Sequence, residues 1–321
     1  MHLSVSQLLL TPWMMGVMTT AVKLRVFSIL SHGEMTAKEI ADEAGSITER
    51  LEPLLEACAC MSLLNKNNDK YENTYFSAIY FVEGRKHYVG DFLELMHYES
   101  LQWFRLAKII KGETNEKINI PYFEYNHKTF ITAMNCLGHL GEAEAMCDFA
   151  DLSGCRKMVD AGGGSGLYSI ALCRRYPKLQ STIFDLKETI EVTQEFISKN
   201  AVKDRITLQK GDFLKDDFGT ELDAVLMSDM VYGELEAEKV LKNAWNSLKP
   251  KGKLIVRGYY SDVDKTKSLF GSLFRVKQLL DNWERPILNL AGLEKIVEKT
   301  GFTIKQISPL TEFSFALLGE K

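Results

Sequence analysis

The chain has 321 residues, of which 45% are hydrophobic and 26% are charged. These fractions are typical of a soluble globular protein, and the length predicts two domains rather than one hydrophobic core. The formal net charge of −4 argues against nucleic acid or an anionic membrane as a partner, because either would favour an excess of Lys and Arg.

The six cysteines show no metal-ligand spacing, and Cys58 and Cys60 lie two apart in a helical pattern, where they would face different ways. We therefore expect no metal site, and we interpret the cysteines as reduced thiols of a cytoplasmic protein.

Residues 1–18 form an apolar arm that is interrupted by Pro12 and lacks the basic start and the cleavage site of a signal peptide. The arm is too short to span a bilayer. A monomer would expose Leu8–Leu10 and Trp13–Met15, so we expect the arm to be buried against a second copy of the chain.

Residues 19–84 show a helical pattern that ends in two short strands. Thr36 with Glu39 predicts a capping box at the start of one helix, and Gly45 predicts its end. Thr48 begins the next helix, and a polar turn separates the strands. Three helices followed by such a hairpin predict a winged-helix module.

Winged helices elsewhere bind DNA, so the charge of this module decides between two functions. The helix that would enter the groove, 48–59, carries Arg50 against Glu49, Glu52 and Glu56. Phosphate contacts need a net excess of Lys and Arg. We therefore prefer dimerisation to DNA binding.

Residues 90–150 are helical in pattern and rich in aromatic side chains. Met134, Asn135 and His139 follow one another on one helical face. Such residues are usually inter-domain core, but an aromatic and Met-rich wall is also what an apolar pocket needs. Both interpretations stay open from the pattern alone.

Residues 151–321 alternate strands with helices, which predicts a doubly wound sheet with its ligand at the carboxyl ends of the strands. A loop at 249–252 precedes the fifth strand, and a short turn makes the last two strands an antiparallel edge hairpin. The expected strands are 157–161, 181–185, 205–210, 222–228, 252–258, 302–308 and 312–319.

The turn after the first of these strands is rich in glycine. Gly162, Gly164 and Gly166 allow positive φ and bring backbone N–H groups against a ligand. Asp185 ends the second strand, where a carboxylate can accept both hydroxyls of a ribose. The spacing fits a nucleotide site, and a Gly-rich turn without a ligand is the alternative.

The sequence from Asp160 to Gly166 resembles the S-adenosylmethionine (SAM) loop of class I methyltransferases, Asp-x-Gly-Gly-Gly-x-Gly. The later motifs 184–186, 211–213 and 223–227 are similar to those of the plant-type and bacterial small-molecule O-methyltransferases, in the same order. The resemblance covers nearly the whole chain and implies SAM as cofactor.

The same resemblance implies the domain organisation. A winged-helix dimerisation domain would occupy residues 1–95, and a helical linker that forms the acceptor-pocket wall would occupy 96–150. An α/β, Rossmann-like domain with a seven-stranded mixed sheet would occupy 151–321. The implied partners are a second copy of the chain and a small-molecule methyl acceptor, with no nucleic acid and no membrane.

The family pattern also assigns the contacts with the methionine and ribose parts of SAM. Gly162 and Gly164, in the motif that Asp160 begins, would pass the methionine part. Asp185 would take the ribose hydroxyls, and Leu186 would lie on adenine.

Further contacts follow from the later motifs. Asp212 would accept the exocyclic amine of adenine, and Phe213 beside Gly211 would stack on the ring; a helix cap is the alternative for Asp212. Met227 or Ser228 would border the sulfonium.

For the acceptor, the resemblance implies a pocket wall at 96–150. The implied acceptor contacts are Tyr122, Met134, Asn135, His139 and Tyr232.

The sequence departs from the family at the catalytic base. The O-methyltransferases carry His-Asp after the fourth strand, whereas this chain has Tyr232–Gly233 or, by another count, Met230–Val231. All six histidines lie at or before His139, and the flanking Glu has no clear equivalent, although Glu284 is near.

We therefore expect a SAM-dependent methyltransferase that acts on a small, apolar or aromatic molecule by in-line transfer, without the histidine base. A sulfur, a neutral amine, an acidic phenol or an activated carbon would suit as acceptor, with Tyr232 orienting it by a hydrogen bond. Two alternatives remain: a family member that binds SAM or S-adenosylhomocysteine without methylating, and a SAM-responsive winged-helix regulator.

Overall fold

The computed structural model describes residues 4–113, 127–261, 269–280 and 288–321. Contacts divide the chain into two compact units. The N-terminal unit comprises residues 1–101, 120–124 and 132–139, and the C-terminal unit comprises 102–119, 125–131 and 140–321. The segment expected to be a linker therefore contributes to both units, and each unit is described by itself.

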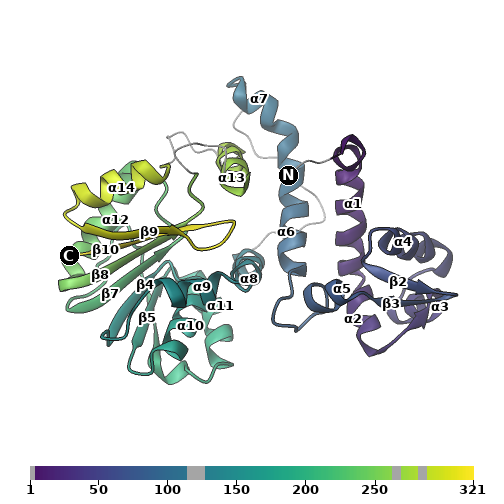
Figure 1. The fold of residues 1–321 in the computed structure, drawn as a ribbon, viewed down its shortest axis with the longest axis horizontal. Coiled ribbons are helices and arrows are strands. Elements are labelled where there is room, and N and C mark those ends of the chain that lie inside the picture. Colours follow the sequence, from purple (N-terminus) through teal and green to yellow (C-terminus); the bar gives the residue numbers. More distant parts are fainter. Residues whose placement is uncertain (1–3, 114–126, 262–268, 281–287) are drawn as a thin grey trace. The chain divides into compact units, whose positions relative to one another are not determined.

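The N-terminal unit is built from helices and a small antiparallel sheet with the strand order β1-β3-β2 (Figure 1). Its elements are α1 (Val5–Lys23), α2 (Val26–Ile29), η1 (Leu30–His32), β1 (Met35–Thr36), α3 (Ala37–Ala44), α4 (Thr48–Cys60), β2 (Leu64–Asn67), β3 (Lys70–Asn73), α5 (Tyr75–Tyr80) and α6 (Gly90–Ser100). Helix α8 (His127–Gly138) is divided between the two units.

The expected capping box is present at the start of α3. The Glu39 N–H donates to Thr36 Oγ1 at 3.3 Å, and the Thr36 N–H donates to Glu39 Oε2 at 2.7 Å. Gly45 ends the helix with a φ of 62°, in the left-handed region that glycine adopts without strain. The helices and the hairpin after them have the expected winged-helix order.

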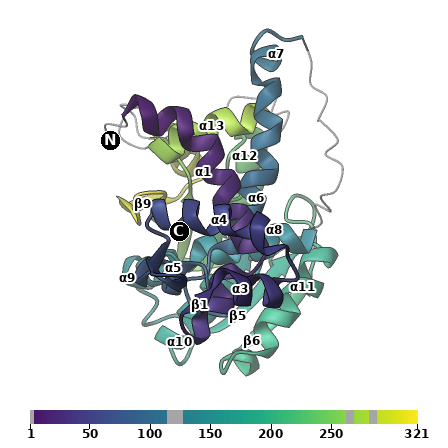
Figure 2. The ribbon, with the colours of Figure 1, turned by 90° about the vertical axis from the view of Figure 1, so that its right-hand side faces the viewer.

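The apolar arm is one helix, so the expectation that Pro12 interrupts it was wrong. Helix α1 contains Pro12 and ends before Arg25, whose φ is 58°. Proline removes one N–H donor from a helix, and the rest of α1 keeps its hydrogen bonds. Helix α1 lies beside α6 in both views (Figures 1 and 2).

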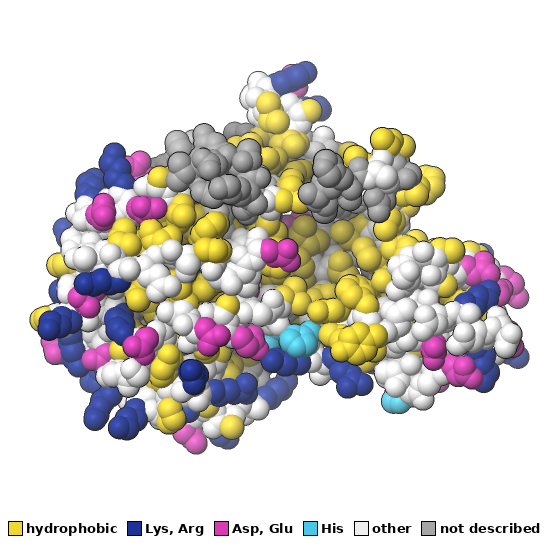
Figure 3. Space-filling model, in the orientation of Figure 1, with side chains coloured by type: hydrophobic (Ala, Val, Ile, Leu, Met, Phe, Trp, Pro, Cys, Tyr) yellow, Lys and Arg dark blue, Asp and Glu magenta, His cyan; other side chains and the backbone are white. Residues whose placement is uncertain are grey.

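The outer face of α1 is apolar and exposed. Leu9 is 73% and Trp13 is 74% exposed, and hydrophobic side chains gather over the first turns of the helix (Figure 3). No single described helix has the length and apolar composition to cross a membrane. Residues 8–23 and 26–32 meet that test only when taken together, and the chain bends by 51° between them.

The C-terminal unit is a seven-stranded mixed sheet with the order β6-β5-β4-β7-β8-β10-β9 (Figure 1). Strands β4 to β8 are parallel, and β10 is antiparallel to both β8 and β9, so the expected edge hairpin is confirmed. The strands are β4 (Lys157–Ala161), β5 (Gln180–Asp185), β6 (Ile206–Lys210), β7 (Leu222–Ser228), β8 (Leu248–Gly258), β9 (Thr303–Pro309) and β10 (Phe315–Glu320).

Helices cover both faces of this sheet. The remaining elements of the unit are η2 (Leu101–Arg105, at the boundary between the units), α7 (Leu106–Ile110), α9 (Glu142–Phe149), α10 (Leu167–Arg175), α11 (Lys187–Ser198), η3 (Lys203–Arg205), α12 (Glu234–Ser247), α13 (Leu269–Leu280) and α14 (Leu290–Lys299). Alternate residues of β7 point to opposite faces: Val225 and Met227 pack with α12 and α14, whereas Ala224 and Leu226 pack with α9, α10 and α11.

The fifth strand begins earlier than expected. The residues 249–252, expected as a loop, belong to β8. The register against β7 shifts there, because Leu222 pairs with Leu248 but Ala224 pairs with Lys253. Lys251 has a φ of 65°. The Lys-Pro-Lys-Gly sequence is thus an irregularity inside a strand rather than a loop before it.

Candidate functional site

The glycine-rich turn joins β4 to α10 at the carboxyl end of the sheet. Its glycines have positive φ, at 66° for Gly162, 55° for Gly164 and 77° for Gly166. The Gly162 N–H donates to Phe184 O at 2.8 Å, which ties the turn to β5. A Cβ on Gly164 would meet only Ile131 Cδ1, at 3.9 Å, so this part of the backbone stays open to a ligand.

Asp185 ends β5 next to the turn and is 8% exposed. The Gly164 N–H donates to its Oδ2 at 2.9 Å, and the Leu186 N–H donates to its Oδ1 at 2.7 Å. Each carboxylate oxygen has a second lone pair for another donor. The carboxylate is therefore fixed beside the turn by backbone, and it keeps the capacity to accept hydroxyl groups.

Asp160 lies beneath the turn and is fully buried. Ser169 Oγ donates to its Oδ2 at 2.6 Å, and Ser169 itself is 2.8 Å from Ser181 Oγ. Its Oδ1 is buried and has no hydrogen-bond partner among the described residues. Burial raises the pKa of Asp160 to about 7, although the hydrogen bond from Ser169 opposes the shift.

The motif after β6 is held by local contacts. A Cβ on Gly211 would lie 2.1 Å from the Phe184 ring, so the close approach of that ring requires glycine. Asp212 pairs with Lys215 at 2.6 Å and accepts the Leu214 N–H at 2.9 Å, and these contacts lower its pKa. Asp212 thus caps a local turn, and because the next helix is α12 (Glu234–Ser247), it is not the helix cap that was its alternative role. Phe213 is partly buried against the core.

The carboxyl end of β7 approaches the same turn. Met227 is fully buried and pairs with Ala161 of β4, and Ser228 is partly exposed. Met230 packs on the turn, since its sulfur is 3.3 Å from the place of a Cβ on Gly162.

Tyr232 is buried and its hydroxyl is paired on both sides. The hydroxyl donates to Asp229 Oδ1 and accepts the Tyr259 N–H at 3.1 Å. Its ring lies 5.5 Å from the rings of Tyr260 and Phe274. Sequence reasoning missed Asp229, because it compared only the positions at which the family carries its His-Asp pair.

Asp229 differs from Tyr232 in exposure and in charge. It is partly exposed and directly follows β7, with a φ of 62°. Burial raises its pKa to about 6, against the opposing charges of Arg257 and Lys277. The end of β7 therefore holds a basic carboxylate beside the glycine-rich turn.

The expected acceptor contacts other than Tyr232 precede β4 in the chain. Tyr122 is outside the described residues. Met134, Asn135 and His139 lie together at the end of α8 in the N-terminal unit, where the His139 N–H donates to Asn135 O at 3.2 Å. His87 Nδ1 lies 2.9 Å from His139 O. Their role toward an acceptor stays a prediction.

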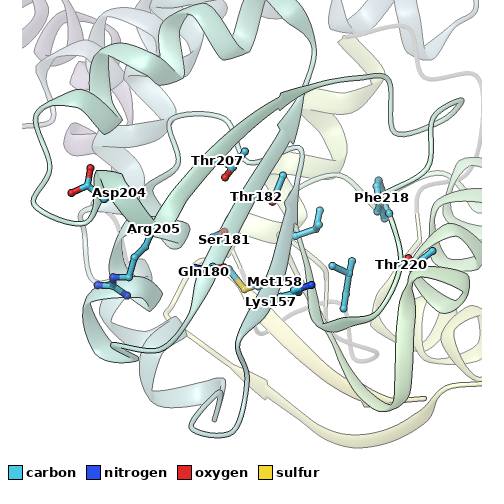
Figure 4. Close-up of a pocket in the computed structure, with 13 residues that line it drawn as sticks. Lys157, Met158, Gln180, Ser181, Thr182, Asp204, Arg205, Thr207, Phe218 and Thr220 are labelled. Atoms are coloured by element: carbon cyan, nitrogen blue, oxygen red, sulfur yellow. The ribbon is translucent and has the colours of Figure 1, made fainter.

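A hollow of about 350 Å³ lies at the opposite, amino-terminal ends of the strands (Figure 4). It is lined by Gln180, Asp204 and Arg205 among others, and by none of the expected site residues. Arg205 already donates to Tyr176 O and Leu179 O, each at 3.2 Å. The hollow therefore adds nothing to the expected site.

Comparison with known proteins decides the family. Residues 120–303, more than half of the chain, match the O-methyltransferase domain, and residues 6–83 match the O-methyltransferase dimerisation domain. The chain belongs to the O-methyltransferase family. It is therefore a SAM-dependent methyltransferase, as the glycine-rich motif indicated.

Named relatives of this methyltransferase act on different atoms. The 3-hydroxy-5-methyl-1-naphthoate 3-O-methyltransferase of Streptomyces sahachiroi is 28% identical over 292 residues, which cover 88% of this chain and 83% of that protein. The bacteriochlorophyllide d C-20 methyltransferase of Chlorobaculum tepidum is 26% identical over 247 residues, 74% of this chain and 73% of that protein.

Solved structures confirm the fold of the methyltransferase. Human N-acetylserotonin methyltransferase in complex with SAM aligns with a TM-score of 0.87 and 21% identity, over 99% of this chain and 96% of that one. The seven-stranded Rossmann-like domain after a helical dimerisation domain is thus the family architecture.

The carboxyl ends of β4 and β5 have features that fit SAM. The turn presents open backbone at Gly164, Asp185 can accept hydroxyl groups, and the orphaned Oδ1 of Asp160 lies where a donor or a cationic group would satisfy it. An acidic site of this kind suits a ligand that carries a sulfonium and an ammonium group.

Proposed function

We propose that this methyltransferase moves the methyl group of SAM to a small, apolar or aromatic acceptor without a histidine base. The observation that carries the proposal is the sequence after β7, where Tyr232–Gly233 or, by the other count, Met230–Val231 correspond to the family's His-Asp pair. Residues 151–321 contain no histidine at all.

The proposed cofactor contacts are those of the family motifs. Gly162 and Gly164 pass the methionine part, while Asp185 accepts the ribose hydroxyls. The position of Asp185 beside Gly164, at 2.9 Å, supports this assignment. Leu186 is 43% exposed, which leaves an apolar surface for adenine.

The remaining contacts are proposed from the position of each residue in the family motifs. Asp212 and Phe213 take the adenine ring, although Asp212 also pairs with Lys215. Met227 and Ser228 border the sulfonium from the end of β7. Met134, Asn135 and His139 are the proposed acceptor contacts, and Tyr122, the fourth from this segment, lies outside the described residues. Two chains assemble through the dimerisation domain.

Bound SAM supplies an electrophilic methyl on a positively charged sulfur. The protein's own contribution is then mainly to align the acceptor, which can lower a barrier by roughly 7–11 kcal/mol. A general base adds a factor of about 10²–10⁴. Loss of the histidine is therefore compatible with useful rates. The O- and C-methylating relatives support acceptors of more than one chemical type.

Methyl transfer to a panel of phenols, thiols and amines, read as formation of S-adenosylhomocysteine, tests this function. Calorimetry with SAM separates the alternatives. Binding without product from any acceptor would favour a non-methylating member. A SAM-dependent DNA shift at physiological salt would favour the winged-helix regulator. The net acidic charge of helix α4 argues against that alternative, because DNA phosphates repel it.

A further inference from the structure

The first residue after β7 has an uncommon backbone conformation. Asp229 has a φ of 62°, a backbone conformation that residues other than glycine adopt only rarely. Its N–H donates to Arg257 O at 2.8 Å, so β8 holds it in this conformation. Such residues persist only where their surroundings over-determine them, and they cluster at functional sites.

The carboxylate of Asp229 is held from one side. The Tyr232 hydroxyl donates to its Oδ1, and the same hydroxyl accepts the Tyr259 N–H at 3.1 Å. Tyr232 itself is 6% exposed and packs between Tyr260 and Phe274. The Tyr232 proton is thus used in a hydrogen bond within the protein and its ring is packed in the core, whereas Asp229 is partly exposed.

Asp229 also lies close to the glycine-rich turn. Its neighbour Met230 packs on Gly162, with 3.3 Å between the sulfur and the place of a Cβ. Two residues earlier in β7, Met227 pairs with Ala161, the last residue of β4 before the turn. The carboxylate is therefore at the edge of the sheet at which the proposed cofactor site lies.

We propose that Asp229 is the proton acceptor of the methyl transfer, that Tyr232 is its positioning residue, and that the methyl acceptor is a phenol that is protonated at neutral pH. This inference rests on the proposed function. The phenolic O–H bond breaks, its proton passes to a carboxylate oxygen of Asp229, and the electron pair stays on the phenolic oxygen. Asp229 becomes neutral, the acceptor becomes an anionic nucleophile, and the proton later leaves to water.

The charges around Asp229 suit this role. Arg257 of β8 and Lys277 of α13 favour the carboxylate, whereas burial and Glu142 of α9 disfavour it. Arg257 is itself paired with Glu142 at 2.8 Å. The titratable phenols that face the group have pKa values raised by burial and stay neutral; they are Tyr168, Tyr259 and Tyr260.

The resulting pKa of Asp229, about 6, is close to the ordinary value of a histidine. A base is most effective when its pKa lies near the working pH, so this carboxylate is ionised at pH 7 and more basic than an exposed aspartate. Asp229 therefore offers in this chain the basicity that the absent histidine supplies elsewhere.

The test compares Asp229→Asn with wild-type protein. Asparagine keeps the acceptor oxygen for Tyr232 but cannot take a proton. With an ordinary phenol we expect kcat to fall by about 10²–10⁴-fold, while SAM binding by calorimetry stays within a few-fold. With a nitrophenol that is already ionised, the variant should regain a kcat within a few-fold of wild type. Asp217→Asn, at an exposed position, is the matched control.

A second readout does not depend on activity. Carbon-13 NMR of aspartate-labelled protein should show a carboxyl titrating near pH 6 besides that of Asp160 near pH 7, and Asp229→Asn should remove only the former. Tyr232→Phe deletes a hydrogen bond to the charged form, so it should move this titration and the acid limb of kcat to higher pH.

Two results would overturn the inference. The first is a wild-type kcat of Asp229→Asn with an ordinary phenol. The second is a fall in the kcat of Asp229→Asn that is as large with the ionised phenol as with the ordinary one. Either result would leave the proposed function intact. No product from wild-type protein with any acceptor would overturn both the inference and the proposed function.

Discussion

At the scale of single residues, the site depends on a few groups whose conformation or ionisation is unusual. Gly164 has a positive φ beside open space, Asp185 is fixed by two backbone N–H groups, and Asp160 is buried with an unpaired oxygen. Each of these features leads to a separate prediction.

Asp185→Ala should weaken SAM binding by one to two orders of magnitude. The change removes a carboxylate that accepts ligand hydroxyls and also holds the Gly164 N–H, a loss of about 1.5–3 kcal/mol for charge-assisted hydrogen bonds. Isothermal titration calorimetry measures it, with Asp217→Ala as control. An unchanged affinity would contradict the ribose assignment.

Gly164→Ala should also weaken SAM binding, because the new methyl group points into open space beside the turn. The left-handed backbone costs about 1–2 kcal/mol of stability for alanine. Gly219 has a φ of 94° and equally open surroundings. Gly219→Ala should therefore lose similar stability and keep its affinity, and urea unfolding with calorimetry on both variants separates strain from ligand contact.

Asp160 should make stability depend on pH. Its pKa of about 7 in the folded protein exceeds the ordinary value of about 3.9. Between these values the folded state binds the extra proton, so the free energy of unfolding falls as pH rises. The free energy of unfolding of Asp160→Asn, relative to that of wild type, should therefore rise by up to about 1.4 kcal/mol per pH unit between pH 4 and 7.

Urea unfolding of the ligand-free protein at pH 5 and pH 7 measures this difference. Asp217→Asn is the control and should follow the wild-type curve. Parallel curves for Asp160→Asn and wild type would show that the carboxyl of Asp160 is not perturbed.

At the scale of elements, a buried ion pair ties α9 to the sheet. Glu142 of α9 is 0% exposed and Arg257 of β8 is 3% exposed, with 2.8 Å between Oε2 and Nη2. Ser314, between β9 and β10, donates to both oxygens of Glu142, and Thr311 donates to one of them. One carboxylate therefore connects a helix, a central strand and the edge hairpin.

Arg257→Met should destabilise the C-terminal unit by about 3–5 kcal/mol, because it leaves Glu142 buried without its cation. Adding Glu142→Leu should restore part of that loss, since the uncompensated charge is then gone. Thermal unfolding of the two single variants and the double variant measures the coupling. A double variant as unstable as the sum of the single ones would contradict a mutual ion pair.

Elements were predictable where local sequence decides them. The apolar strands β4 and β7 and the capping box at Thr36 have the expected bounds, because apolar runs and cap residues act over a few positions. The start of β8 was not predictable, because Lys-Pro-Lys-Gly is typical of a turn. Contacts with distant residues hold it in the sheet: Leu248 pairs with Leu222 of β7, and Lys251 and Gly252 exchange backbone hydrogen bonds with Lys321.

The candidate site likewise contains residues that local sequence predicts and residues that it does not. Gly162 and Gly164 belong to one short motif, Asp185 ends the next strand of the sheet, and Gly164 and Asp185 meet as expected. Asp229 could not be found in this way, because its φ, its burial and its contact with Tyr232 depend on β8 and on packing far along the chain.

At the scale of the whole molecule, the exposed face of α1 predicts a dimer. Leu9→Lys combined with Trp13→Lys should convert a dimer into monomers, because both side chains are about three-quarters exposed in the single chain. Light scattering measures the mass. Leu235→Lys changes an exposed leucine of α12 and should leave the mass unchanged. A monomeric wild-type protein would refute the assignment.

The fixed position of Asp185 has a consequence for turnover in the cell. The proposed contacts of Gly164, Asp185 and Leu186 all concern the adenosine and methionine parts, which S-adenosylhomocysteine shares with SAM. These contacts do not discriminate between the two, so the spent product should compete with fresh SAM, and only the groups around the sulfonium would favour SAM. The rate would then follow the ratio of the two metabolites, and sustained methylation would need a second enzyme that removes the product.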